Sequence, residues 1–287
     1  MADMADIDDA ECAWDEIHET LEASGWSGRV IPVTYVNSSA AIKAFVGARG
    51  GACCTSSNAK QVFAWALEGG TKPVHKGERI KVLFLPDQHL GRNTAAEFGI
   101  DVARSTCVYN PRRAEAGEPL GGMSAEKLAR AKVILWAGHC SVHQLFRKEH
   151  CDEARKRDPK VQIIVHPECS RDVVEHADLT GSTEFIIKTL RDAPRGSTWT
   201  VGTEIHLVNR LAREAAARGV KVNMLSGCQC LCTTMYRIDE PHLLWVLDHL
   251  TQGTTVNQIR VPDEMRGPAL VSLERMLALA QPMARLS

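Results

Sequence analysis

The run Val30-Ile31-Pro32-Val33-Thr34-Tyr35-Val36 is short, almost wholly apolar, and followed at once by the polar pair Asn37-Ser38. A strand that is buried on both faces of a sheet has this composition, because neither face meets water. Similar runs recur along the chain at Gly51–Thr55, Ile80–Leu85, Val133–Ala137, Gln162–Val165, Trp199–Val201 and Val220–Leu225.

Segments with helical periodicity separate these runs. Asn58–Leu67 and Glu204–Ala216 both repeat their apolar residues at helical spacing. Strands that alternate with helices in this way predict an α/β fold with parallel sheets. We also expect helices at Leu243–Leu250 and Met265–Leu279, the second beginning properly only after Gly267-Pro268. The Pro- and Gly-rich segment Tyr109–Gly122 is expected to be a loop.

A weak internal repeat divides the chain into two halves. Each half carries a polar strand end, a hydroxyl-rich turn before a helix, and a second strand end with an acid and a His-Leu pair. These segments are Tyr35–Ser38, Thr55–Ser57 and Asp87–Leu90, then His166–Cys169, Thr180–Ser182 and Glu204–Leu207. The repeat predicts homologous three-layer α/β/α domains at residues 27–122 and 123–240, followed by a helical segment at 241–287. Chance similarity between short α/β units is the alternative.

Composition excludes several classes of protein. The 287 residues carry a net charge of -1, which gives no general attraction to nucleic acid or to an anionic membrane. The first residues are acidic rather than basic, and no apolar stretch approaches the roughly 20 residues that span a bilayer. We therefore expect a cytoplasmic protein, in which the ten cysteines are buried side chains or metal and redox ligands rather than disulfides.

Polar residues gather where the predicted strands end. Ligands bind beyond the carboxyl ends of the strands in open parallel sheets. The residues expected at these ends are Tyr35, Asn37, Asp87, Cys140, His166, Glu168 and Glu204. Each has an ordinary structural explanation by itself, but several at repeated positions predict a binding site.

Two cysteine-containing motifs point to a metal or a redox centre. Gly138–His143 brings a thiol and two imidazoles past a strand, although a simple helix cap would also explain it. The alternating Cys228, Cys230 and Cys232 do not have the spacing of zinc ribbons, and they indicate a soft metal site or a redox pair. Together with Cys140 they could supply thiolates to an iron–sulfur cluster.

Other motifs suggest acid–base chemistry and anion binding. His166-Pro167-Glu168 could pair an imidazole with a carboxylate, or could be a plain turn with a solvated glutamate. Thr55–Asn58 and Thr180–Thr183 precede predicted helices, whose free amides bind carboxylates or phosphates. Ordinary helix capping is the alternative for both.

Six motifs in order resemble the quinolinate synthase family, and the resemblance extends from Ala2 to about Leu279. They are Pro32–Ser38, Cys54–Ala59, Pro86–Asn93, Gly138–His143, His166–Cys169 and Gly181–Thr183. The resemblance implies three homologous α/β domains around a pseudo-threefold axis, with one cysteine from each domain holding a [4Fe–4S] cluster. It implies a transferase of NAD biosynthesis that condenses iminoaspartate with dihydroxyacetone phosphate to quinolinate, with L-aspartate oxidase as a functional partner.

The resemblance also assigns roles to residues of this chain. Cys140 and Cys232 match cluster ligands, and the cluster would act as a Lewis acid through an open iron site. Substrate-binding positions would be Tyr35, Val36, Asn37, Ser56, His166, Pro167, Glu168, Ser182 and Thr183. Among these, Glu168 and Tyr35 would move protons, and His166 with Asn37 would hold the dicarboxylate. Ser56 and Thr183 would bind its oxygens.

The chain departs from the family pattern at its beginning. Met1-Ala2-Asp3-Met4 matches a family segment that lies about two residues after the first cluster cysteine, so residues 1–26 would be the remnant of the first domain. Cys12 lies within the expected helix and does not replace that ligand. Either the true start codon lies upstream, or the natural product is truncated, and the chain as it stands is expected to be a poor catalyst. The alternative functions are a cluster-free fragment that binds a dicarboxylate or phosphate, and a zinc or redox protein that uses Cys228, Cys230 and Cys232.

Overall fold

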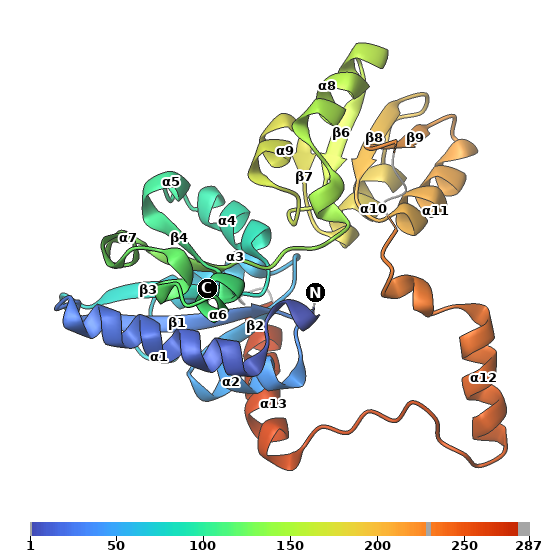
Figure 1. Ribbon diagram of the computed structural model, residues 1–287. Helices are drawn as coiled ribbons and strands as arrows, with labels where there is room; N and C mark the ends of the chain where they lie inside the picture. Colours follow the sequence, from blue (N-terminus) through green and yellow to red (C-terminus); the bar gives the residue numbers. More distant parts are fainter. Residues whose placement is uncertain (1, 228–230, 281–287) are drawn as a thin grey trace, which may run out of the picture.

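Two parallel β-sheets form the protein, and Figure 1 shows both with their helices. The computed structural model describes residues 2–227 and 231–280. The five-stranded sheet has the order β2-β1-β3-β5-β4, and the four-stranded sheet has the order β7-β6-β8-β9. Every strand pair is parallel, which confirms the predicted α/β class. The strands are β1 (Gly28–Tyr35), β2 (Ala52–Cys54), β3 (Arg79–Leu85), β4 (Thr106–Tyr109), β5 (Val133–Trp136), β6 (Gln162–Val165), β7 (Leu179–Thr180), β8 (Thr198–Gly202) and β9 (Lys221–Met224).

The internal repeat of the sequence reappears in the order of the strands. In the first sheet the chain runs from β1 to its neighbour β2 and then crosses to β3 on the other side of β1. In the second sheet it runs from β6 to β7 and then to β8 in the same manner. Each sheet therefore has a point where the direction of winding reverses, and such points leave a crevice at the carboxyl ends of the strands.

Helices cover both faces of each sheet. The core on one face of the first sheet includes residues of α1, α2 and α7, and that on the other includes residues of α3 and α4. In the second sheet α8 and α9 pack on one face, and α10 and α11 on the other. The longer helices are α1 (Ile7–Ala23), α2 (Ala40–Ala48), α3 (Ala59–Leu67), α4 (Gln88–Glu97), α8 (Lys148–Arg157), α10 (Thr183–Arg191), α11 (Ile205–Ala216), α12 (Glu240–Thr251) and α13 (Asp263–Ala280). The shorter ones are α5 (Val102–Ser105), α6 (Pro111–Glu115), α7 (Ala125–Arg130) and α9 (Arg171–His176), with single 3₁₀ turns at Ala2–Met4, Pro119–Gly122, His143–Leu145 and Met235–Arg237.

The apolar runs are strands that alternate their side chains between two cores. In β3, Leu83 and Leu85 enter one core, whereas Val82 and Phe84 enter the other. Because both faces are covered, the strand sequence is continuously apolar rather than alternating. Burial on both faces is therefore the physical reason that these strands could be recognised in the sequence.

The first sheet extends beyond the boundary expected at residue 122. β5 pairs with both β3 and β4, after the chain crosses through α7. β4 was not expected, and it ends at Tyr109, where the predicted loop begins. α1 buries Ala13 and Ile17 in the core of this same sheet. The division into domains, with residues 1–26 assigned to a preceding one, stays a prediction.

The start of the last helix was predicted wrongly. α13 begins at Asp263 and continues through Pro268, rather than starting after Gly267-Pro268. A proline removes only one backbone donor, and tertiary packing can outweigh that loss. Here α13 packs on α2 and β2, and Arg275 donates to the carbonyl oxygens of Gly47 and Gly51 at 3.2 and 2.6 Å. By contrast α12 has no buried residue and stands away from both sheets (Figure 1).

One buried side chain on α4 forms hydrogen bonds with a loop of the second sheet. The Nδ2 of Asn93, on α4, donates to the carbonyl oxygens of Pro167 and Cys169 at 2.8 and 2.9 Å. Both acceptors lie in the loop that follows β6. This contact fixes the second sheet's loop beside the end of the first sheet. Within the described residues, no helix has the length and apolar character needed to cross a membrane.

We predict that Gly47→Ala destabilises the protein. A Cβ at this position would lie 1.9 Å from the carbonyl oxygen of Pro268, so α2 and α13 would have to separate. Overpacking of this kind costs about 1–3 kcal/mol of unfolding free energy. The matched control is Gly267→Ala, since a Cβ there meets no described heavy atom within 4 Å. Urea denaturation of both variants measures the difference, and equal stabilities would contradict this packing.

Candidate functional site

A cavity of about 830 Å³ lies where the carboxyl ends of strands from both sheets meet. Parallel strands bring these ends to one edge of each sheet. Tyr35 ends β1, His166 follows β6, and Thr203 follows β8. Nine of the candidate site residues named from the sequence line this cavity: Tyr35, Val36, Asn37, Cys140, His166, Glu168, Thr183, Glu204 and Cys232.

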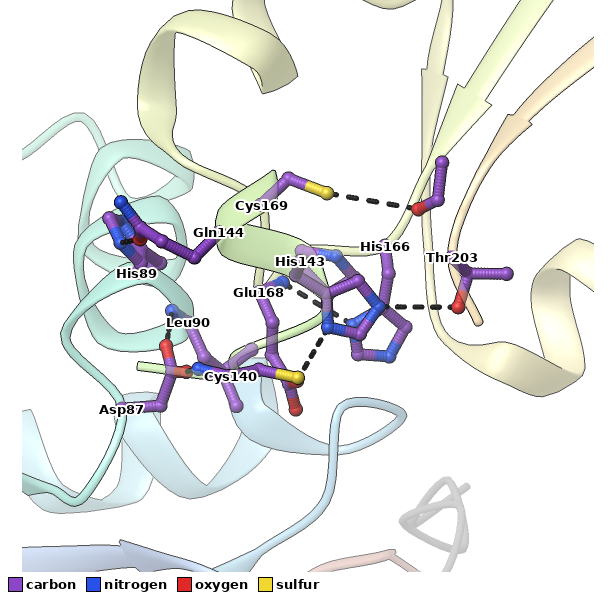
Figure 2. A network of polar contacts seen from close by, with 12 residues as sticks. Asp87, His89, Leu90, Cys140, His143, Gln144, His166, Glu168, Cys169 and Thr203 are labelled. Carbon is purple, nitrogen blue, oxygen red and sulfur yellow. Dashed lines mark hydrogen bonds and ion pairs between the residues drawn. The ribbon is translucent and has the colours of Figure 1, made fainter. Parts of the chain in front are cut away.

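A thiol, an imidazole and a carboxylate meet at the buried end of the cavity (Figure 2). His143 Nδ1 lies 2.9 Å from Glu168 Oε2, and His143 Nε2 lies 3.2 Å from the hydroxyl oxygen of Thr203. The Cys140 side chain also hydrogen-bonds His143. The His143 and His166 rings stack, with their centroids 4.6 Å apart. Only 7% of His143 and 3% of Glu168 are exposed, so their charges must be satisfied by one another.

Electrostatics make His143 and Glu168 an ion pair. Burial lowers the pKa of His143, but hydrogen bonds to Cys140 and Glu168 outweigh burial and raise that pKa to about 10. Burial raises the pKa of Glu168, but the hydrogen bond from His143 and the charges nearby bring it below its ordinary value. The imidazolium and the carboxylate therefore stabilise each other where little of either side chain is exposed to solvent.

Two neighbours of this pair stay neutral. Burial, followed by the charge of His143, lowers the pKa of His166 to about 3. Its Nδ1 accepts a hydrogen bond from the backbone N–H of Glu168 at 3.3 Å, so the neutral ring carries its proton on Nε2. Burial and the charge of Glu168 raise the pKa of Tyr35, whose phenol is hydrogen-bonded to Glu168 and Ser56. Tyr35 is thus a hydrogen-bond donor at the cavity wall.

Asp87 holds the loop that carries Cys140. Its side chain is fully buried at the end of β3, and Oδ1 accepts from the backbone N–H of Leu90 at 2.7 Å, which caps α4. Oδ2 accepts from the backbone N–H of Cys140 at 3.0 Å. Burial and the nearby Glu168 raise the pKa of Asp87, whereas these two N–H donors oppose that change. One carboxylate thus joins a helix start to the cysteine loop.

Three of the expected substrate-binding residues are not among those that line the cavity. Ser56 hydrogen-bonds Tyr35, which does line the cavity. Pro167 uses its carbonyl oxygen to accept from Asn93. The Ser182 hydroxyl accepts from the backbone N–H of Phe185 at 3.3 Å and caps α10, as the capping alternative anticipated. Their assignment to substrate stays a prediction.

Sequence reasoning placed Asp87 among the polar strand ends and His143 in a cysteine-containing motif, but it gave neither a specific role and did not single out Thr203. His143 follows Cys140 by three residues, a spacing that brings two side chains to one side of a turn, and this was the available signal. Thr203 carried no signal, because a threonine after a strand is common. The importance of Asp87 depends on a contact with a loop 53 residues away, which the sequence does not encode locally.

Cys140 and Cys232 are the described cysteines that line the cavity. Both are partly buried, and both pack against the same apolar cluster as Cys169. Thiolates in an apolar surrounding are the usual ligands of iron–sulfur clusters, so the chemistry of these two residues fits such a cluster. Cys12 lies exposed on α1, and Cys228 and Cys230 fall outside the described residues.

The fold and this site define a class: a parallel α/β protein with a thiol-, imidazole- and carboxylate-lined cavity at the ends of its strands. The sequence pattern of the family described as "Quinolinate synthetase A protein" matches residues 1–278. The chain is 50% identical over 280 residues to the "Quinolinate synthase" of Acidobacterium capsulatum, covering 97% of this chain and 70% of that one. It is 52% identical over 282 residues to the "Quinolinate synthase" of a Nocardioides species, covering 97% and 67%.

The chain belongs to the quinolinate synthase family of transferases. It spans about 70% of the length of the relative from Acidobacterium capsulatum. The resemblance noted from six short motifs is therefore confirmed over nearly all of the chain.

We predict that Asp87→Ala lowers the free energy of unfolding by about 1–3 kcal/mol, because the N–H groups of Leu90 and Cys140 lose their acceptors inside the protein. The control is Asp101→Ala, which removes an exposed cap of α5 whose N–H groups stay hydrated. Chemical denaturation compares the two variants. An equal loss in both would contradict the special role of the buried carboxylate.

Proposed function

We propose that this protein catalyses the quinolinate synthase reaction, the condensation of iminoaspartate with dihydroxyacetone phosphate to quinolinate, which supplies the pyridine ring of NAD. The observation that carries the proposal is the convergence of Tyr35, Cys140, His166, Glu168 and Cys232 on one cavity. Identity of about 50% to relatives named for this reaction supports it.

The dicarboxylate would be held by neutral donors rather than by charge alone. His166 and Asn37 both line the cavity, and the Nε2–H of the first and the amide of the second can donate to carboxylate oxygens. Thr183 is the first residue of α10, where free backbone amides and the positive end of the helix favour an anion. Ser56 supports the same binding through its hydrogen bond with Tyr35.

Proton transfer is the role we infer for Glu168 and Tyr35. They are already joined by a hydrogen bond, so a proton taken up by the carboxylate has the phenol as its neighbour. The imidazolium of His143 keeps Glu168 ionised and therefore able to accept a proton from the substrate. Burial of the pair limits the access of water that would compete for the same proton.

A [4Fe–4S] cluster is the cofactor that the family implies, and Cys140 and Cys232 would be ligands for it. When bound, a cluster with one open iron supplies Lewis acidity toward a substrate oxygen or nitrogen. Asp87 would keep Cys140 in place through its backbone N–H. The cavity could take iminoaspartate and dihydroxyacetone phosphate beside these thiols.

The assignment of the cluster ligands is tested by anaerobic reconstitution with iron and sulfide. We expect a broad visible absorption near ~400 nm from sulfur-to-iron charge transfer in the unaltered chain. Cys140→Ser and Cys232→Ser should each lose most of it, because each variant removes one of the two thiolates that this chain contributes to the cluster. Cys12→Ser, at an exposed cysteine on α1, should keep it. Full absorption in Cys140→Ser would exclude that residue as a ligand.

Glu168→Gln tests the proton transfer. Removing a general acid–base group lowers the turnover number by about 10²–10⁴-fold. Glu175→Gln is the matched control, because Glu175 is exposed on α9 and pairs only with Arg171 among the described ion pairs. Quinolinate formation by the reconstituted protein is the measurement. Unchanged turnover in Glu168→Gln would remove its role, and cluster-bearing protein that forms no quinolinate would overturn the proposed function.

A further inference from the structure

Three side chains of different chemistry present ligand atoms close enough to surround one ion. The Cys140 Sγ, a His143 ring nitrogen and a Glu168 carboxylate oxygen all lie within 4.8 Å of one another. His143 and Glu168 are buried, and Cys140 is partly buried. Surface clusters of acids commonly lack an ion, but a buried group of sulfur, nitrogen and oxygen donors is a different arrangement.

The spacing of the three ligand atoms is within reach of tetrahedral zinc coordination. Tetrahedral zinc with bonds of about 2.0–2.3 Å keeps its ligand atoms about 3.3–3.6 Å apart. His143 Nδ1 and Glu168 Oε2 are 2.9 Å apart, which is a hydrogen-bond distance. An ion that replaced the shared proton would widen this gap by a few tenths of an ångström, and it would draw in any of the other ligand pairs, all within 4.8 Å, that exceed the separation around zinc. The mixed donor set favours a zinc-type ion over magnesium or calcium, which prefer oxygen.

Each ligand already has a second contact that holds it in position. His143 Nε2 lies 3.2 Å from the Thr203 hydroxyl, Glu168 is hydrogen-bonded by Tyr35, and the Cys140 backbone N–H donates to Asp87. Contacts of this kind fix the orientation of metal ligands and usually change metal affinity by 10–100-fold when removed.

Charge balance permits a divalent ion to replace the protons that these three side chains hold. A thiolate and a carboxylate with a neutral imidazole carry two negative charges, which a divalent ion neutralises. Binding releases one proton from the Cys140 thiol and one from the His143 imidazolium to solvent. All three residues line the cavity, so the fourth position of the ion would face it and take a water molecule.

We propose that the protein binds one divalent, zinc-type ion at Cys140, His143 and Glu168. This mononuclear site differs from an iron–sulfur cluster in its donors and does not use Cys232. If Cys140 also serves the cluster, which rests on the proposed function, the ion and the cluster exclude each other. The site itself stands without that function, because its test needs neither iron nor substrate.

Cobalt(II) is the probe, since it occupies zinc sites and absorbs when a thiolate is bound. The full chain, stripped with a chelator and reduced, is titrated with cobalt(II) and then with zinc. We expect one equivalent of cobalt with a near-ultraviolet thiolate band, and displacement of that band by zinc. Cys140→Ser should abolish the band. Thr203→Val should keep the band but weaken binding by about 10-fold, because the imidazole loses its second contact.

Cys12→Ser and Cys232→Ser are the matched controls, and both should bind cobalt as the unaltered chain does. Survival of the thiolate band in Cys140→Ser, or its loss in Cys232→Ser, would overturn the proposal, since the ion would then lie elsewhere. Far-ultraviolet circular dichroism confirms that each variant is folded. Should Cys140→Ser fail to fold, unchanged cobalt affinity in Thr203→Val would overturn the proposal by itself.

Discussion

The arrangement of the site depends on the buried contact between His143 and Glu168. An unpaired charge in such a place costs several kcal/mol, so neither side chain could be ionised there alone. Their hydrogen bond of 2.9 Å resolves this by making each the counter-charge of the other. Burial is the main cause that keeps His166 and Tyr35 neutral, and the charge of His143 on His166 and of Glu168 on Tyr35 adds to it.

The fold brings this pair together from distant parts of the chain. His143 follows β5, the last strand of the first sheet in chain order, and Glu168 follows β6, the first strand of the second sheet. Asn93 ties α4 to the loop of Glu168, and Asp87 ties β3 to the loop of Cys140. The joint between the sheets is therefore built from buried hydrogen bonds rather than from apolar packing alone. Such bonds are directional, so they fix the positions of the loops that carry the site.

Much of the fold could be predicted because burial on both faces makes parallel strands apolar. β1, β3 and β6 were found for this reason, whereas β4 was missed because it is short and adjoins the Pro- and Gly-rich segment. Cys140 and Glu168 could be named from motifs. The role of Asp87 could not, because it comes from a tertiary contact. The continuation of α13 through Pro268 likewise depends on its packing against α2, which no local pattern reveals.

The most direct test of a shared cofactor is a crystal structure of the anaerobically reconstituted protein with anomalous scattering at the iron edge. We expect iron sites in the cavity beside Tyr35 and Glu168, with the sulfur atoms of both Cys140 and Cys232 bonded to them. Iron bound elsewhere, or iron in the cavity with either of these thiols unbound, would contradict the convergence of the two sheets on one cofactor.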